Sequence, residues 1–185
     1  MKTIIISGKS GSGKDTFANI MREKLESTGK RCVTIHFADL VKHYLTDYYG
    51  WNGEKDEAGR TMLQSLGTDK MRSLIPEYWA ETVAKFLAVA AYFNDFDVAF
   101  IPDARFPNEI ETVFEFNQNS VSIRIERYNE NGSMYLNPAL IDEQRNHPSE
   151  VSLDKYSFDY IVENHNMDDF IAAAETVLKD IGLLN

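Results

Sequence analysis

A glycine-rich turn between an apolar run and a helical pattern constrains this chain more than any other feature. The β-branched run at residues 3–7 is followed directly by Gly8-Lys-Ser-Gly-Ser-Gly-Lys-Asp-Thr16. This segment fits the pattern G-x-x-x-x-G-K through Gly8, Gly13 and Lys14. Glycines allow backbone N–H groups to converge on an anion, and the N-terminus of the following helix adds a favourable dipole. The turn therefore predicts a loop that binds nucleotide phosphates, with Lys14 reaching the β- and γ-phosphates.

The position after the lysine departs from the usual pattern, which places Ser or Thr there. Asp15 occupies it, and Thr16 follows. A carboxylate beside a triphosphate is repulsive, but the first turn of a helix favours an anion and Mg²⁺ could bridge the two groups. The sequence leaves open whether Asp15 or Thr16 reaches the metal. A turn without a ligand is disfavoured by the third glycine, Gly11, and by the flanking elements. The expected nucleotide-binding residues of the loop are Gly8, Lys9, Ser10, Gly11, Ser12, Gly13, Lys14, Asp15 and Thr16.

Short apolar runs alternate with helical patterns along the rest of the chain. We expect strands at residues 3–7, 31–37, 97–102, 121–125 and 158–162. We expect helices before Gly29, after a cap at Asp39, over 60–74, 76–93 and 108–117, and at the C-terminus, with a surface loop at 48–59. Strands that are apolar on both faces and separated by helices predict a parallel sheet covered on both sides. The chain is thus predicted to be one α/β domain, residues 1–185, without repeats or linkers.

Two helices show apolar stripes that predict a buried face. Pro76 is expected in the first turn of one of them. The stripe of that helix consists of Trp79, Val83, Phe86, Leu87 and Ala90, and the stripe of the C-terminal helix consists of Phe170, Ile171, Ala174, Val177, Leu178 and Ile181.

The charge balance limits the partners of the chain. It has 19 Lys and Arg against 29 Asp and Glu, a formal net charge of −10. Polyanions and anionic membranes attract basic surfaces, so neither a nucleic-acid polymer nor a membrane is an expected partner. No apolar run approaches the roughly 20 residues of a membrane span, and the N-terminal apolar stretch is too short for a signal peptide. The single cysteine, Cys32, is predicted to be an inert core thiol, consistent with a reducing cytoplasm.

Further candidate site residues follow the predicted strands. Asp103 and Arg105 come directly after the third strand. Ligands of open α/β sheets bind beyond the carboxyl ends of the strands, so we expect Asp103 to hold Mg²⁺ or its waters and Arg105 to clamp a phosphate. The alternative is that Asp103 or Asn108 caps the next helix and the two charges pair. Asn164, after the fifth strand, could hydrogen-bond a nucleotide base or simply form a turn.

More cations lie at the fourth strand and in the polar segment 128–150, which we expect to be a mobile excursion. Arg124 and Arg127 lie at the end of the strand, and Arg145 and His147 lie in the excursion. A basic lid that folds over phosphates excludes water and stabilises a transferring phosphoryl group. Each of these residues taken singly could equally be an ordinary solvated side chain.

Six motifs follow one another along most of the chain. They are residues 8–16, Phe37-Ala-Asp39, Arg60-Thr-Met-Leu-Gln-Ser-Leu-Gly-Thr-Asp-Lys-Met-Arg72, Pro102-Asp-Ala-Arg-Phe-Pro-Asn-Glu109, His147-Pro-Ser-Glu150 and Tyr160-Ile-Val-Glu-Asn164. In this combination the chain resembles the bacteriophage-type deoxynucleoside monophosphate kinases of the P-loop nucleoside-monophosphate-kinase group. The phosphate loop alone is generic, whereas its combination with the other motifs is much more specific.

The resemblance implies a P-loop kinase three-layer sandwich with a five-stranded parallel sheet. It also implies a helical monophosphate-binding region at about residues 39–95 and a lid at about 128–150. The implied acceptor site contains Asp39, Lys42, Arg60, Gln64, Arg72, Asp103 and Arg105. The implied catalytic residues are Lys14, Arg105, Arg127 and Arg145. Asn164 would lie by the adenine of ATP.

The resemblance further implies transfer of the γ-phosphoryl group of Mg·ATP to a deoxynucleoside 5′-monophosphate. The second pKa of a phosphate monoester is about 6, so the attacking oxygen needs no catalytic base. Two alternatives remain: a kinase of the same architecture for dephospho-coenzyme A or phosphomevalonate, and an ATP-binding P-loop module that signals by conformation. The protein is expected in the cytoplasm, that of a host if phage-encoded. Base preference, deoxyribose selectivity and the choice between monomer and homodimer stay open.

Overall fold

Five strands form one parallel sheet in the computed structural model, which describes residues 1–185. They are β1 (Lys2–Gly8), β2 (Cys32–Thr34), β3 (Val98–Ala104), β4 (Ser120–Arg127) and β5 (Tyr160–Asn164), in the order β2-β3-β1-β4-β5. Ile4, Ile5 and Ile6 of the central strand β1 are completely buried, because both faces of the sheet are covered. The predicted α/β fold with a five-stranded parallel sheet is therefore confirmed.

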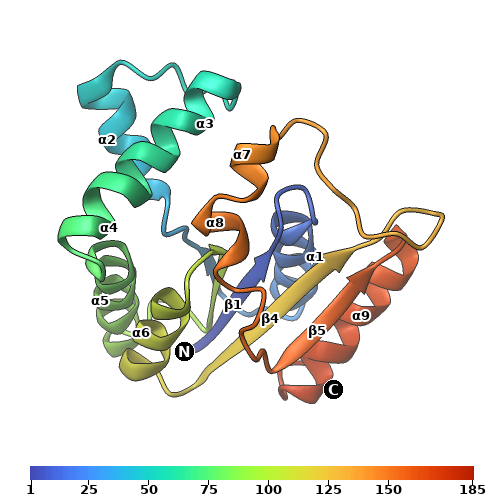
Figure 1. Cartoon of the computed structure of the whole chain (residues 1–185). Helices are drawn as coiled ribbons and strands as arrows, with labels where there is room; N and C mark the ends of the chain where they lie inside the picture. Colours follow the sequence, from blue (N-terminus) through green and yellow to red (C-terminus); the bar gives the residue numbers. More distant parts are fainter.

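Two core clusters occupy the two faces of the sheet, because successive side chains of a strand point to opposite faces. Ile4 and Ile6 pack with α1 (Lys14–Glu26) and α9 (Met167–Asp180), whereas Ile5 packs with α5 (Tyr78–Tyr92) and α6 (Pro107–Phe116). The rings of Phe17 and Phe170 join α1 to α9, with their centroids 4.8 Å apart. The layers of helices, sheet and helices are visible in Figure 1.

Between β2 and β3 the chain forms a series of helices that stands beside the sheet, at the upper left of Figure 1. It consists of α2 (Asp39–Tyr49), α3 (Glu57–Gln64), the π-helix η1 (Ser65–Lys70), α4 (Met71–Leu74) and then α5. The helix predicted over 60–74 is confirmed as helical throughout, but its middle part is the π-helix η1 instead of α-helix. The carbonyl of Gly67 in η1 accepts a hydrogen bond of 2.9 Å from the indole of Trp79. A π turn does not follow the 3.6-residue period on which the prediction relied.

Several boundaries before α3 also differ from the prediction. β2 is three residues long rather than seven, because the chain leaves the sheet towards Asp103, whose carboxylate accepts the N–H groups of Phe37 and Ala38. Asp39 does not cap α2; it is the first helical residue, and its carboxylate accepts the backbone N–H of His36. The loop predicted at 48–59 is shorter, since α2 runs to Tyr49 and α3 begins at Glu57.

The helical stripes are buried except at their edges. Trp79, Val83, Leu87 and Ala90 are buried in α5, but Phe86 is 45% exposed. In α9 the exception is Ile171, which is 37% exposed, while Phe170, Ala174, Val177 and Leu178 are buried. Each exception is adjacent in sequence to a buried residue and is therefore turned away from it by about 100° around the helix axis. Pro76 precedes α5 by two residues instead of lying in its first turn. No helix combines the length and the apolar character that crossing a membrane would need.

The segment between β4 and β5 contains two short helices, α7 (Asp142–Arg145) and α8 (Pro148–Val151). It therefore contains helices that the sequence did not predict, whereas its mobility stays a prediction. Figure 1 shows both helices between α3 and the sheet. Asn137 donates a hydrogen bond of 3.0 Å to the hydroxyl of Ser10, and the ammonium of Lys9 donates one of 2.8 Å to the carbonyl of Glu150. These contacts hold the segment against the phosphate loop.

Candidate active site

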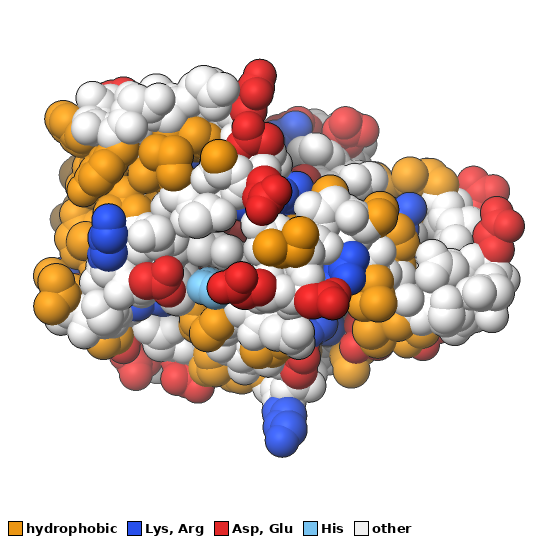
Figure 2. Space-filling view, turned by 45° about the horizontal axis from the view of Figure 1, so that its top comes forward, with side chains coloured by type: hydrophobic (Ala, Val, Ile, Leu, Met, Phe, Trp, Pro, Cys, Tyr) orange, Lys and Arg blue, Asp and Glu red, His pale blue; other side chains and the backbone are white.

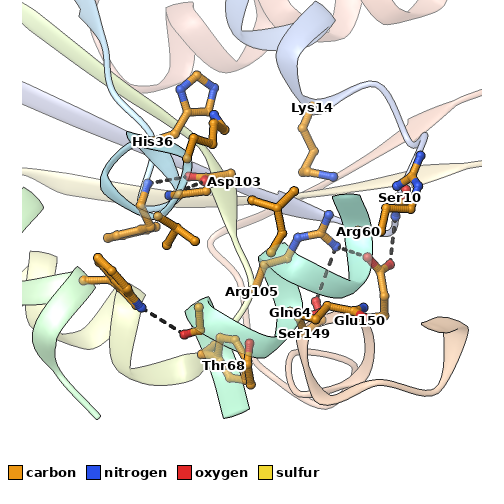
Figure 3. A pocket seen from close by; sticks show the side chains of 18 of the residues that line it. Ser10, Lys14, His36, Arg60, Gln64, Thr68, Asp103, Arg105, Ser149 and Glu150 are labelled. Carbon is orange, nitrogen blue, oxygen red and sulfur yellow. Dashed lines mark hydrogen bonds and ion pairs between the residues drawn. The ribbon is translucent and has the colours of Figure 1, made fainter. Parts of the chain in front are cut away.

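A cavity of about 450 Å³ opens at the carboxyl ends of β1 and β3. It lies between the phosphate loop, the helices α3 and η1, and the segment that carries α8 (Figure 3). The sequence-predicted site residues that line it are Ser10, Gly11, Lys14, Asp15, Lys42, Arg60, Gln64, Arg72, Asp103 and Arg105.

Close contacts explain two glycines of the phosphate loop. Gly13 has a φ of 102°, in the region that side chains disfavour. A Cβ atom on Gly13 would lie 2.9 Å from Nδ2 of Asn164, and one on Gly8 would lie 2.6 Å from the carbonyl oxygen of Ile125. Asn164 itself donates a hydrogen bond of 2.9 Å from Nδ2 to the carbonyl of Ser12. Asn164 thus holds the loop, a contact that the sequence did not indicate.

The ammonium of Lys14 is buried against the loop. Its Nζ donates hydrogen bonds to the carbonyls of Gly8 at 2.9 Å and of Lys9 at 3.0 Å. Burial, followed by the positive charge of Arg105, lowers the pKa of Lys14 to about 7. A buried cation with a depressed pKa lacks sufficient compensating negative charge, so phosphate oxygens at this place would raise the pKa again.

Arg105 shares the carbonyl of Gly8 with Lys14. Its Nη1 lies 3.3 Å from that oxygen and 2.7 Å from Oε1 of Glu150. The other carboxylate oxygen of Glu150 accepts the backbone N–H of Ser10 at 2.9 Å. Figure 3 shows Arg105 between Lys14 and Glu150. One carboxylate therefore bonds both to the phosphate loop and to the arginine beside it.

His36 connects the helix of the phosphate loop to α2. Its Nε2 lies 3.2 Å from the carboxylate of Asp15, and its Nδ1 lies 3.4 Å from that of Asp39. The hydrogen bond with Asp15, and then the one with Asp39, raise the pKa of His36 to about 9. Although burial acts in the opposite direction, hydrogen bonds from His36 and Lys42 lower the pKa of Asp39 below its usual range. At neutral pH the imidazole of His36 is therefore protonated between two carboxylates.

Asp103 lines the cavity, but its carboxylate is held by the backbone. Its two oxygens accept the N–H groups of Phe37 and Ala38, each at 3.0 Å. Neither Asp103 nor Asn108 caps α6, since the Asn108 side chain bonds to Glu77 and to the carbonyl of Pro76. The capping alternative for these residues is therefore wrong.

Arg72 is held by a buried carboxylate at the far end of the cavity. Glu109 forms an ion pair with Arg72 and accepts the backbone N–H groups of Arg105 at 2.6 Å and Phe106 at 3.0 Å. Burial raises the pKa of Glu109 to about 7. The Arg72 guanidinium lies 4.1 Å from the ring centroid of Phe106, and its Nη1 is buried without a hydrogen bond. A buried donor without a partner is uncommon in folded proteins, and this one belongs to a side chain that lines the cavity.

A second cavity of about 400 Å³ lies on the other side of the phosphate loop. Predicted residues that line it are Gly13, Thr16, Arg127 and Asn164. The rings of Tyr128 and His165 stack there, with centroids 4.9 Å apart and planes 16° apart. Arg127 donates a hydrogen bond of 3.0 Å to the carbonyl of Gly11.

Two cationic residues that were predicted for the site, Arg145 and Arg124, lie outside both cavities. Arg145 lines neither cavity, because its guanidinium bonds to Asp142 at 2.8 Å and to the carbonyl of Asn137 at 3.3 Å. Arg124 is buried within β4 and bonds to Ser7 and Asp154. The pair with Asp142 is local, three residues apart in the sequence, whereas the partners of Arg124 are distant in the sequence and not evident from it.

Sequence reasoning did not single out His36, Glu109 or Glu150 individually. His36 directly precedes a motif, whereas Glu109 and Glu150 end the motifs Asp103-Ala-Arg-Phe-Pro-Asn-Glu109 and His147-Pro-Ser-Glu150. The usable signal was a titratable residue that lies in, or directly before, one of the six motifs. Its partner, however, lies on another element in each case.

Comparisons with known proteins agree on the fold. A family model described as adenylylsulphate kinase matches residues 1–65, about a third of the chain. No curated protein matches the chain in sequence. A sugar kinase from Janibacter sp. HTCC2649 is similar in structure, with a TM-score of 0.58 at 13% identity, covering 100% of this chain and 99% of that one.

Two further solved structures are similar. The APS kinase CysC of Mycobacterium tuberculosis, in complex with AMPPNP and APS, gives a TM-score of 0.51 at 15% identity, covering 97% of this chain and 96% of that one. The shikimate kinase of Bacteroides thetaiotaomicron gives 0.50 at 14% identity, covering 97% and 98%. With its phosphate loop and five-stranded parallel sheet, the chain therefore has the α/β fold of these kinases.

Proposed function

We propose that this protein is an ATP-dependent kinase that phosphorylates a deoxynucleoside 5′-monophosphate. The charge of the main cavity carries the proposal. Although the net charge of the chain is −10, six cationic side chains line this cavity: Lys14, Lys42, Lys55, Arg60, Arg72 and Arg105. On the face seen in Figure 2, acidic and basic side chains are interspersed. Cations gathered beside a phosphate loop favour a small anionic ligand.

The carboxylates of the cavity favour a phosphate acceptor over a hydroxyl acceptor. A hydroxyl group needs a base to take its proton, whereas a phosphate monoester is largely deprotonated at neutral pH. Each carboxylate of the cavity already accepts hydrogen bonds within the protein: Asp15 from His36, Asp103 from Phe37 and Ala38, Glu109 from Arg72, and Glu150 from Arg105 and Ser10. None is therefore a free base.

The second cavity supports a nucleotide donor. ATP would place its base beside Asn164 and the stacked pair of Tyr128 and His165, with its phosphates along the loop. Arg127, bonded to the loop at Gly11, would lie beside those phosphates. Donor and acceptor would then approach the loop from opposite sides, which is the arrangement that in-line transfer requires.

In the proposed reaction an oxygen of the acceptor phosphate attacks the γ-phosphorus. The bond from that phosphorus to the bridging oxygen breaks, and ADP leaves. Lys14 and Arg105, which share the Gly8 carbonyl, balance the charge of the transferring group. Arg72, which lines the same cavity, would balance part of the charge of the acceptor phosphate. Positioning and charge neutralisation account for most of the catalysis in such transfers.

The residues present fit Mg²⁺ through Asp15. The carboxylate follows Lys14 directly and its side chain is 74% exposed. Protein sites commonly hold Mg²⁺ by one or two carboxylates together with substrate phosphates. When bound, the ion neutralises negative charge on the β- and γ-phosphates. Thr16 lies in the second cavity and Asp103 is bonded to backbone amides, so we assign the metal to Asp15.

A second candidate is the phosphorylation of another small anionic acceptor, of the adenylylsulphate class. The match of residues 1–65 to the adenylylsulphate kinase model favours it. The same cationic cavity would accept such a substrate, so the choice rests on an assay rather than on charge.

A coupled assay of ADP release tests both candidates. The purified protein is given Mg·ATP with each of the four deoxynucleoside monophosphates, their ribose counterparts, adenylylsulphate, shikimate, or no acceptor. We expect turnover with at least one deoxynucleoside monophosphate far above the rate without acceptor. Lys14→Ala, purified in parallel, controls for a contaminating kinase. Turnover with adenylylsulphate alone would replace the first candidate by the second, and equal ADP release in all samples would contradict both.

A further inference from the structure

We infer that Glu150 is a positioning residue, which holds the guanidinium of Arg105 in the orientation that clamps the transferring phosphate. The inference rests on the proposed function, since it assigns Arg105 to the same transfer site. It also gives the motif His147-Pro-Ser-Glu150 a role that the proposed reaction leaves unassigned.

The hydrogen bonds of the Arg105 guanidinium all involve one nitrogen. Nη1 lies 2.7 Å from Oε1 of Glu150, 3.3 Å from the carbonyl of Gly8 and 3.4 Å from the carbonyl of Ser149. Nε and Nη2 make no hydrogen bond within the protein, and the side chain lines the main cavity. The N–H donors of an arginine lie in one rigid plane, so fixing the position of one nitrogen also sets the directions of the other donors. The carboxylate thus leaves two donors for phosphate oxygens.

Glu150 is itself firmly held. Its side chain is only 10% exposed, and its second oxygen accepts the N–H of Ser10 in the phosphate loop at 2.9 Å. Its backbone carbonyl accepts the ammonium of Lys9 at 2.8 Å, and Lys9 also pairs with Asp154 at 2.6 Å. Lys9 and Ser10 belong to the phosphate loop, so Glu150 sets the position of Arg105 relative to the loop that holds the donor phosphates.

The N-terminal turn of α8 orients the carboxylate of Glu150. His147 is the N-cap of this helix, and its Nδ1 accepts the backbone N–H of Ser149 at 3.2 Å. Pro148 follows at the first helical position, where its fixed φ favours the turn. The Ser149 carbonyl then reaches Arg105 directly at 3.4 Å. Two successive residues of the motif therefore contact the same guanidinium nitrogen.

A double-mutant cycle tests the inference. Steady-state kinetics are measured for the wild type, Glu150→Gln, Arg105→Ala and the double variant. We expect Glu150→Gln to lower kcat by about tenfold to a hundredfold, the size expected when a catalytic group is misplaced, with the KM for ATP changing much less. In the Arg105→Ala background the same substitution should have little further effect, because the group on which it acts is gone. Glu143→Gln, an exposed carboxylate in the neighbouring α7, is the matched control.

An independent measurement observes Arg105 directly. The Nε–H signal of Arg105 is recorded by NMR in the absence of substrates and assigned by its loss in Arg105→Lys. We expect this signal to shift or broaden in Glu150→Gln and to remain in place in Glu143→Gln. If Glu150→Gln does not fold, Glu150→Asp is measured in the same way, because it retains the charge but shortens the reach.

Equal losses of kcat in both backgrounds would overturn the inference, and so would an unchanged Nε–H signal. A wild type without kinase activity would instead contradict the proposed function. The NMR experiment would then still report whether Glu150 orients Arg105.

Discussion

The ammonium of Lys14 is buried from water and makes no hydrogen bond to a carboxylate. Its partners are two loop carbonyls, and its pKa is about 7 because burial disfavours the charged form. Glu109 shows the converse effect, since burial raises its pKa to about 7 even beside Arg72. At the residue scale the site therefore contains two groups whose charged states are costly, and an anionic ligand would favour the charged state of Lys14 only. Such perturbed groups are common where a site is arranged for binding or catalysis.

Replacing Lys14 by methionine should affect activity and stability differently. Under the proposed function we expect turnover to fall by at least about a hundredfold, because the variant loses the buried cation beside the phosphate loop. In the wild type the folded pKa lies near 7 and the unfolded pKa near 10.5, so between these values the unfolded chain binds more protons and stability rises with pH. The variant lacks this contribution.

Urea unfolding of both proteins at pH 7 and pH 9.5 checks the second effect. The wild-type free energy of unfolding should increase relative to that of Lys14→Met, by at most about 1.4 kcal/mol per pH unit. A difference that stays constant with pH would show that the pKa of Lys14 is not depressed. Near-normal kinase activity of the folded variant would contradict the mechanism.

At the scale of elements, the phosphate loop is held from three sides. The carbonyl oxygen of Ile125 in β4 lies close to Gly8, and Asn164 of β5 donates a hydrogen bond to Ser12. The α8 segment forms hydrogen bonds with Lys9 and Ser10. A loop that must present backbone N–H groups to phosphates benefits from such fixation, because no ordering is then needed on binding. The strands thus determine the shape of the loop as much as its glycines do.

Gly8→Ala and Gly29→Ala form a matched pair of variants. Comparing them separates the effect of a steric contact made by the new Cβ atom from the effect of an unfavourable backbone conformation. A Cβ atom on Gly8 would lie 2.6 Å from the carbonyl oxygen of Ile125, whereas one on Gly29 would meet nothing within 4 Å. Gly29→Ala should cost about 1 kcal/mol, since its φ of 85° is strained for alanine. Gly8→Ala should cost clearly more and should weaken nucleotide binding, as measured by thermal unfolding with and without AMPPNP. Equal destabilisation of the two variants would contradict this account of the loop.

At the scale of the whole molecule, the two core clusters share their strands. Ile5, Ala99 and Ile101 belong to one cluster, while Ile4 and Phe100, their neighbours in the same strands, belong to the other. Neither face of the sheet can lose its packing without disturbing the strands that support the opposite face.

The net charge of −10 is also a property of the whole molecule. It favours solubility and opposes binding to nucleic-acid polymers, while the cavity remains locally cationic.

The shared strands predict one cooperative unfolding transition. Trp51 and Trp79 report on one cluster by fluorescence, and Cys32, which packs against the other, reports by thiol labelling. Burial, followed by Glu26, raises the pKa of Cys32 to about 11, so labelling of the folded protein at pH 8 should be slow. We expect coincident transitions in urea from both probes. Separate midpoints would show that the two faces unfold independently.

The sequence by itself determined the phosphate loop, the alternation of strands and helices and the parallel sheet. These features depend on neighbours in the chain: glycines at fixed spacing, apolar periodicity, and the order of elements. For the same reason Lys14 and Arg105 could be expected at the carboxyl edge of the sheet. The irregular helix at Gly67 and the exposure of Phe86 could not, because both depend on packing against other segments.

Only the tertiary structure decided how the charged groups pair. Ser10 and Glu150 are separated by 140 residues, and Arg72 and Glu109 by 37, yet each pair is in contact. Arg145 belongs to the same predicted cationic set, but it bonds within its own segment and stays outside both cavities. For pairs that are distant in the sequence, the fold decides which partner comes within reach of a long side chain, and local patterns carry no information about that partner. The pair of Arg145 and Asp142, three residues apart, is the local exception.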